Sequence, residues 1–154
     1  MTIKKRIAAD LKSAMKAGEK TKVSVLRMLN AQILDREVQL RSQKGRDYQL
    51  GDGETVEVIA GYAKQRRQSI ASYQEGGRSD LVAQEESELV ILQEYLPKQL
   101  SEEEVEALVE EAIRKSGASG LKEMGAVMKV LMPEVKGAAD GKVVSETVRR
   151  KLSK

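Results

Sequence analysis

The sequence predicts an all-α protein with a four-helix N-terminal subdomain at 1–97 and a three-helix C-terminal subdomain at 98–154. Aromatic residues make up only 3% of the 154 residues, with neither Phe nor Trp. A core must therefore come from Leu, Ile, Val, Ala and Met, which suit packed helices. The 2 Pro and 12 Gly are too few for a β protein with a turn every ~8–12 residues. Apolar residues also recur at helical spacing along most of the chain.

Four helices are expected in the first subdomain. Each has apolar residues three or four positions apart on one face and a glycine or proline after its end. The expected ranges are about 3–17, 21–43, 55–75 and 80–96. Met15 is expected on the apolar face of the first helix, whereas Thr55 and Asp80 are possible N-caps of the third and fourth. A loop punctuated by glycine separates the second helix from the third.

Pro97 marks the expected boundary between the subdomains, because proline disfavours helical geometry at the residue before it. Ser101 follows, with Glu104 three residues later, and this spacing is typical of a capping box at a helix start. The fifth helix is expected to begin there and to end near Gly117. Six of its residues are Glu, so its exposed face is strongly acidic.

Two more helices are expected after the fifth. The sixth is predicted to follow Ser119 and to end at Pro133, and the last is predicted over 145–152, after a loop at 137–142. The residues expected to face inward on the sixth helix are Leu121, Met124, Met128 and Leu131. Val148 and Leu152 are expected to face inward on the last helix.

Charge is unevenly distributed along the chain, although the net charge is only +3. Residues 1–50 hold 12 basic and 5 acidic side chains, and residues 117–154 hold 8 and 4. Residues 81–116, which lie between them, hold 3 basic and 10 acidic side chains. Basic ends around an acidic middle could attract a polyanion. Ordinary solvation of exposed helices is the commoner explanation of such mixed charge.

The composition excludes most familiar enzyme chemistry. The absence of Cys removes thiolate metal sites and thiol nucleophiles, and the absence of His removes the commonest general base. No Walker-type phosphate loop is present, so we expect no catalytic residue, no metal and no cofactor. Neither a secretory signal nor an apolar run of membrane-spanning length is found. The expectation is a cytoplasmic protein without membrane contact.

One candidate site lies around Arg66, near the apolar face of the third helix. A buried guanidinium requires a partner, so an ion pair with Glu85 or Glu88 is favoured over a phosphate contact. The neighbouring cations Lys64 and Arg78 are weaker candidates for binding RNA.

A second candidate site combines a helix glycine, Gly125, with the glycine-bounded loop and the basic last helix. Glycine within a helix costs roughly 1 kcal/mol relative to alanine, so Gly125 is expected to allow a close backbone approach. The loop offers backbone N–H groups and cations, which suit phosphate. An ordinary turn with a helix–helix contact at Gly125 is equally compatible with the residues. The candidate RNA-binding residues here are Met124, Gly125, Gly137, Gly141, Lys142, Arg149 and Arg150.

Short motifs in a fixed order resemble the GatB/YqeY family from the first helix to the last, so the chain is similar to a free-standing YqeY-like protein. Each motif is weak alone, but the ordered set is specific. The motifs are Leu26-Arg27-Met28-Leu29, Lys64-Gln65-Arg66, Gly77-Arg78 with Asp80-Leu81, Tyr95-Leu96-Pro97 with Gln99-Leu100-Ser101, Met124-Gly125-x-x-Met128, and Gly137-x-Ala139-Asp140-Gly141-Lys142.

The resemblance implies two helical subdomains and kinship with the tail of the B subunit of glutamine-dependent tRNA amidotransferase, which grips the outer corner of tRNA. It therefore implies a non-catalytic protein that binds tRNA or another structured RNA. One departure weakens this expectation, because Ala138 stands where the family usually has Lys or Arg. Lys136 or Lys142 would then have to supply the charge.

Two alternatives remain open from the sequence. The chain could be an interaction module that docks an amidotransferase or an aminoacyl-tRNA synthetase through the acidic fifth helix. It could also take part in the carbon–nitrogen ligase activity, with glutamine as amido donor, that is often extended to this family. No catalytic machinery for that reaction is found in the sequence.

Overall fold

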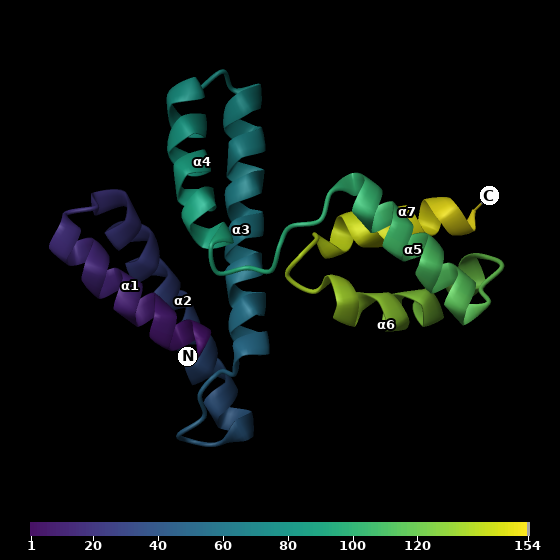
Figure 1. Ribbon diagram of the computed structural model, residues 1–154, viewed down its shortest axis with the longest axis horizontal. Helices are drawn as coiled ribbons and strands as arrows, with labels where there is room; N and C mark the ends of the chain where they lie inside the picture. Colours follow the sequence, from purple (N-terminus) through teal and green to yellow (C-terminus); the bar gives the residue numbers. More distant parts are fainter. Residues whose placement is uncertain (154) are drawn as a thin grey trace. The chain divides into compact units, whose positions relative to one another are not determined.

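The computed structural model describes residues 1–153 as helices joined by short turns and loops (Figure 1). This part of the chain contains no strand, so the all-α prediction is confirmed. The helices are α1 (Ile3–Ala17), α2 (Lys20–Lys44), α3 (Asp52–Glu75), α4 (Ser79–Gln93), α5 (Glu102–Ser116), α6 (Met124–Val135) and α7 (Gly141–Leu152). A short 3₁₀ helix, η1 (Leu121–Glu123), precedes α6. The structure divides into two compact units, Met1–Leu96 and a second that begins at Pro97.

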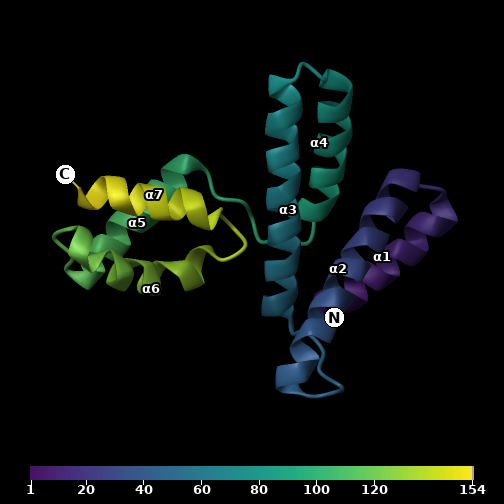
Figure 2. The same cartoon turned by 180° about the vertical axis from the view of Figure 1, so that it is seen from behind.

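The first unit consists of two helical hairpins, α1 with α2 and α3 with α4 (Figures 1 and 2). Gly18 allows the first hairpin turn because its φ of 71° lies in the left-handed region. The two hairpins share one core, in which side chains such as Leu26, Ile59 and Leu92 are fully buried. Burying each side chain of this size stabilises the fold by about 1.5–3 kcal/mol.

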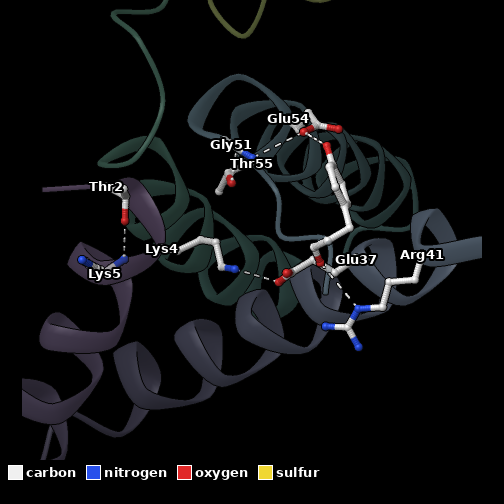
Figure 3. A network of polar contacts seen from close by, with 9 residues as sticks. Thr2, Lys4, Lys5, Glu37, Arg41, Gly51, Glu54 and Thr55 are labelled. Carbon is white, nitrogen blue, oxygen red and sulfur yellow. Dashed lines mark hydrogen bonds and ion pairs between the residues drawn. The ribbon is translucent and has the colours of Figure 1, made fainter. Parts of the chain in front are cut away.

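Polar contacts attach the start of α1 to the second half of α2 (Figure 3). Lys4 Nζ lies 2.8 Å from Glu37 Oε1, and Glu37 is only 4% exposed. At the start of α3, Glu54 accepts hydrogen bonds from the Gly51 amide and the Tyr48 hydroxyl. The hydrogen bond from Tyr48 lowers the pKa of Glu54 below its usual value.

The second unit packs α5, α6 and α7 against one another around a core of mainly Val and Leu side chains. The segment before α5 is bound to the loop after α6. The Leu100 amide donates to the Ala138 carbonyl at 2.8 Å, and Gln99 Nε2 donates to the Gly137 carbonyl at 2.8 Å. Gly137 has a φ of 76°, which favours glycine at this turn.

Two predicted N-caps are wrong. α3 begins before Thr55, whose buried hydroxyl donates to the Gly51 carbonyl at 2.8 Å within the first helical turn. The N-cap of α4 is Arg78, so Asp80 lies inside the first turn, where a carboxylate suits the helix dipole. The last helix also begins earlier than predicted, at Gly141, because the Asp140 side chain caps it.

The predicted apolar faces need correction in α1 and α6. Met15 and Leu121 do not face inward as predicted, because they are 53% and 50% exposed. Leu121 lies in η1, whose tighter 3₁₀ winding breaks the helical phase before α6 begins. Pro133 lies inside α6 rather than ending it, within three residues of its last residue, Val135. The side chains of α6 that are fully buried are Val127, Leu131 and Val135, whereas Met124 and Met128 are half-buried against the same core.

Candidate functional site

The candidate residues of the second unit lie at opposite ends of the α6–α7 pair. These two helices run in opposite directions and pack together (Figures 1 and 2). The loop that joins them contains Gly137, and α7 begins at Gly141 and Lys142. Met124 and Gly125 start α6 and therefore lie at the other end, with Arg149 and Arg150 near the end of α7.

Among the described residues, the loop end has two exposed cations, Lys136 and Lys142, and few free backbone groups. The Asp140 carboxylate accepts the Lys142 amide at 3.0 Å, so this N–H is not available to a phosphate. The loop carbonyls of Gly137 and Ala138 accept bonds from the segment before α5. The Ala138 side chain itself is buried, at 7% exposed. The Lys142 side chain is exposed, and within residues 1–153 no carboxylate lies within ion-pair distance of it.

The two glycines that start α6 and α7 differ in what surrounds them. A Cβ placed on Gly125 would meet no heavy atom within 4 Å, so the alternative of a helix–helix contact at this glycine is wrong. The exposed Gly125 instead leaves the first turn of α6 open to solvent. A Cβ on Gly141 would lie 3.8 Å from Met132 Cε, which is an ordinary van der Waals contact.

Adjacent cations near the end of α7 have different environments. Arg150 Nη2 lies 2.6 Å from Glu106 Oε1, and Lys151 Nζ lies 2.8 Å from Glu110 Oε1. Both pairs join α7 to α5. Arg149 is exposed and has no carboxylate within ion-pair distance in the described part of the chain.

Lys142 and Arg149 lie on one face of α7, because seven residues are close to two helical turns. At a rise of 1.5 Å per residue, their backbones are about 10 Å apart along the axis. Glu146 lies on the same face, one turn from each of them, and is exposed. We call Lys142, Glu146 and Arg149 the outer face of α7. Two cations and one carboxylate give this face a net positive charge.

Arg66 forms the ion pairs that the sequence predicted. Its Nη1 lies 2.8 Å from Glu85 Oε2 and 2.9 Å from Glu88 Oε2, and its Nη2 donates to the Tyr62 hydroxyl. Burial acts to lower the pKa of Arg66, but the hydrogen bonds to Glu85 and Tyr62 outweigh it and the pKa is raised. This guanidinium is therefore an internal link between α3 and α4, and the phosphate alternative for Arg66 is wrong.

Lys64 and Arg78 belong to the first unit, whereas the candidate residues of α6 and α7 belong to the second. Arg78 Nε and Nη2 lie 3.2 and 3.1 Å from the Asp80 carboxylate, and this pair lowers the pKa of Asp80. Both side chains are exposed, so a phosphate would compete with Asp80 for the guanidinium in water. Lys64 is half-buried on α3.

The described residues offer no centre for metal chemistry. Within residues 1–153, no three His, Cys, Asp or Glu side chains come together in a way that could hold a metal ion. None of the helices in that range combines the length and apolarity that crossing a bilayer requires.

The chain belongs to the YqeY-like family, because the model of the Yqey-like protein family matches residues 4–152. It is similar to proteins named "Altered inheritance of mitochondria protein 41, mitochondrial". The relative from Pyrenophora tritici-repentis is 30% identical over 150 residues, which cover 96% of this chain and 77% of that protein. The relative from Saccharomyces cerevisiae strain YJM789 is 27% identical over 136 residues, which cover 88% and 69% of the two chains.

These relatives contradict the expectation of a cytoplasmic protein, since their names assign them to mitochondria. That expectation used the lack of cysteine as an indication of compartment. A chain without thiols has none whose oxidation state could distinguish one compartment from another.

Proposed function

We propose that this YqeY-like protein binds tRNA or another structured RNA through the sugar-phosphate backbone, without catalysis, on the outer face of α7. The observation that carries the proposal is the exposure of Lys142 and Arg149 on one helix face, each without a carboxylate within ion-pair distance in residues 1–153. Cations of this kind can neutralise phosphates and release counterions without giving up an internal partner. Arg150 is not included, because it pairs with Glu106.

The tyrosines favour recognition of folded RNA over stacking on single strands. Stacking requires an exposed aromatic ring for each bound base. Tyr62 and Tyr95 are buried, at 6% and 3% exposed, the Tyr48 hydroxyl is bonded to Glu54, and Tyr73 on α3 is half-buried, so none of the four rings is fully exposed. Contacts to phosphate and sugar, selected by shape, are the usual way in which proteins recognise double-stranded RNA.

The resemblance to the amidotransferase B-subunit tail supports tRNA as the particular ligand within this class. The proposal assigns no chemistry to the chain, so the purified protein should release no ammonia from glutamine in the presence of tRNA. It also does not depend on compartment, because contacts to phosphate are the same wherever the RNA is found.

A titration of the full chain against fluorescent RNAs tests the proposal. The probes are a folded tRNA transcript and poly(U) of the same length, measured by anisotropy at several salt concentrations. The expected result is tighter binding of the tRNA, with an affinity that falls as salt is raised. Absence of binding at low salt, or tighter binding of poly(U), would contradict it.

A further inference from the structure

A shallow groove runs between the end of α1 and the first half of α2, and its floor is apolar. Met15 and Met28, which are 53% and 45% exposed, both line the groove and offer apolar area to a partner. Methionine adapts its shape to different partners and is common on surfaces that bind helices. We call this feature the α1–α2 groove. The lining residues through which the groove would contact a partner are Met15, Lys20, Val23, Arg27, Met28 and Ala31.

The charged residues that line the α1–α2 groove are both positive. Lys20 and Arg27 lie on one side of α2, seven residues and therefore about 10 Å apart along its axis. Both are exposed, and in the described part of the chain neither has a carboxylate within ion-pair distance. Among the residues that the structure describes, no acidic side chain lines the groove. Lys22, one residue along the helix from the groove, differs in being 3.8 Å from Glu94.

We infer that the α1–α2 groove docks an acidic amphipathic helix of a partner protein. From Lys20 to Ala31 the groove is about 16 Å long, which matches three turns of a helix. Apolar side chains at helical spacing on the partner would cover Met15, Val23 and Met28, as in other helix-in-groove complexes. Glutamates seven residues apart on that helix would face Lys20 and Arg27. This surface belongs to the first unit, whereas the RNA face proposed on α7 belongs to the second.

Other occupants fit the groove less well. A nucleic acid could contact the two cations, but among the described residues that line the groove there is no aromatic ring for its bases to stack on. The two methionines would then have no apolar group of the ligand to pack against. A second copy of this chain, related by a two-fold axis, would bring the same cations toward one another. An acidic amphipathic helix satisfies both the apolar floor and the positive edge.

The test uses two synthetic fluorescent peptides of about 18 residues, or five helical turns. Both have Leu at helical spacing, and one has Glu where the other has Lys. The full chain is expected to bind the Glu peptide at least about tenfold more tightly than the Lys peptide. Exchanging both cations, by Lys20→Glu with Arg27→Glu, is expected to reverse this preference. Met28→Glu is expected to weaken the Glu peptide by about tenfold.

Val90→Glu is the matched control, since Val90 is 59% exposed on α4 and does not line the groove. It should leave peptide binding within about twofold of the parent, and circular dichroism should report unchanged helicity for every variant. Equal affinity for the two peptides, or a charge exchange that does not change the preference, would overturn the inference. The inference would also be overturned if Met28→Glu left peptide binding unchanged but abolished self-association measured by light scattering, which would make a second copy the occupant. Loss of RNA binding with unchanged peptide binding would likewise make a nucleic acid the occupant.

Discussion

The two units of the protein differ in how deeply their most buried charge pairs lie. In the first unit, Arg66 pairs with two glutamates between α3 and α4, and Lys4 pairs with the buried Glu37. In the second unit the charge pairs lie on the surface, and Lys142 and Arg149 have no partner of opposite charge within ion-pair distance in residues 1–153. A cation is therefore available to a ligand where it has no ion-pair partner within the fold, however many cations its segment of the chain contains.

The largest effect is expected for Arg66→Ala, which breaks the internal pairing of the first unit. The variant leaves Glu85 and Glu88 together in a half-buried place, and the free energy of unfolding should fall by about 2–3 kcal/mol. Urea unfolding followed by circular dichroism measures this loss. Arg150→Ala, which breaks a surface pair of the second unit, should cost less than about 1 kcal/mol.

A control separates the charge from the packing of the Arg66 side chain. Combining Arg66→Met with Glu85→Gln and Glu88→Gln removes the whole charged cluster and should restore most of the lost stability. If Arg66→Ala and Arg150→Ala were equally destabilising, the contrast between the two units would be refuted.

Replacing Gly137 or Gly141 by Ala should change the free energy of unfolding by amounts that differ by about 1–2 kcal/mol. Gly137→Ala puts a Cβ on a residue with a φ of 76° and should destabilise the protein by that amount. Gly141→Ala should be close to neutral, because its Cβ would meet only Met132 at an ordinary distance. Thermal unfolding of the two variants is the measurement, and equal melting temperatures would show that the turn does not depend on Gly137.

A smaller effect is expected for Glu146→Gln, which removes the carboxylate from the outer face of α7. RNA affinity should rise by about threefold, since a negative charge one helical turn from both Lys142 and Arg149 is lost. Glu86→Gln, at an exposed position of α4 in the first unit, makes the same change in net charge and is the matched control. An equal gain from both variants in the anisotropy titration would mean that net charge matters and the face does not.

The smallest effect at neutral pH concerns Tyr95, whose hydroxyl donates to Asp10 at 2.5 Å. Burial, and then the bond to Asp10, raise the pKa of Tyr95 above its usual value near 10. The unfolded chain therefore loses this proton first as the pH rises. Stability should be unaffected below about pH 9 and should fall above about pH 10.

Urea midpoints measured from about pH 8 to about pH 11 test the alkaline loss of stability. Tyr95→Phe should lower the midpoint at neutral pH, because Asp10 loses its donor, and should make the alkaline fall shallower. If the stability of this variant fell equally steeply at alkaline pH, the fall would be due to a group other than Tyr95.

The sequence was sufficient to predict the helices and one buried charge pair. Regular apolar spacing predicted the all-α class, and the position of Arg66 near an apolar face predicted its pairing with Glu85 or Glu88. The start of α7 was missed because Asp140 before Gly141 is typical of both a turn and a helix cap. Only the backbone conformation, with the Asp140 side chain on the Lys142 amide, distinguishes the two.

The candidate site was harder to predict, because a linear sequence does not say which helix faces meet. Arg149 and Arg150 are neighbours with the same chemistry, yet only Arg150 turns toward α5 and reaches Glu106. The available signal was that Glu106 and Glu110, four residues apart, lie on one face of the acidic helix, where they can pair with a basic helix packed beside it. The surface position of Gly125 had no signal in the sequence.

The salt dependence of tRNA binding by two double variants tests the central claim most directly. Replacing Lys142 and Arg149 by Ala should weaken binding and flatten the log–log salt slope by up to about 1.8, at ~0.9 per lost phosphate contact. Replacing Arg150 and Lys151 by Ala removes the same net charge and should leave the slope close to that of the parent. Equal slopes for the two variants, or a larger change from Arg150 and Lys151, would contradict the account.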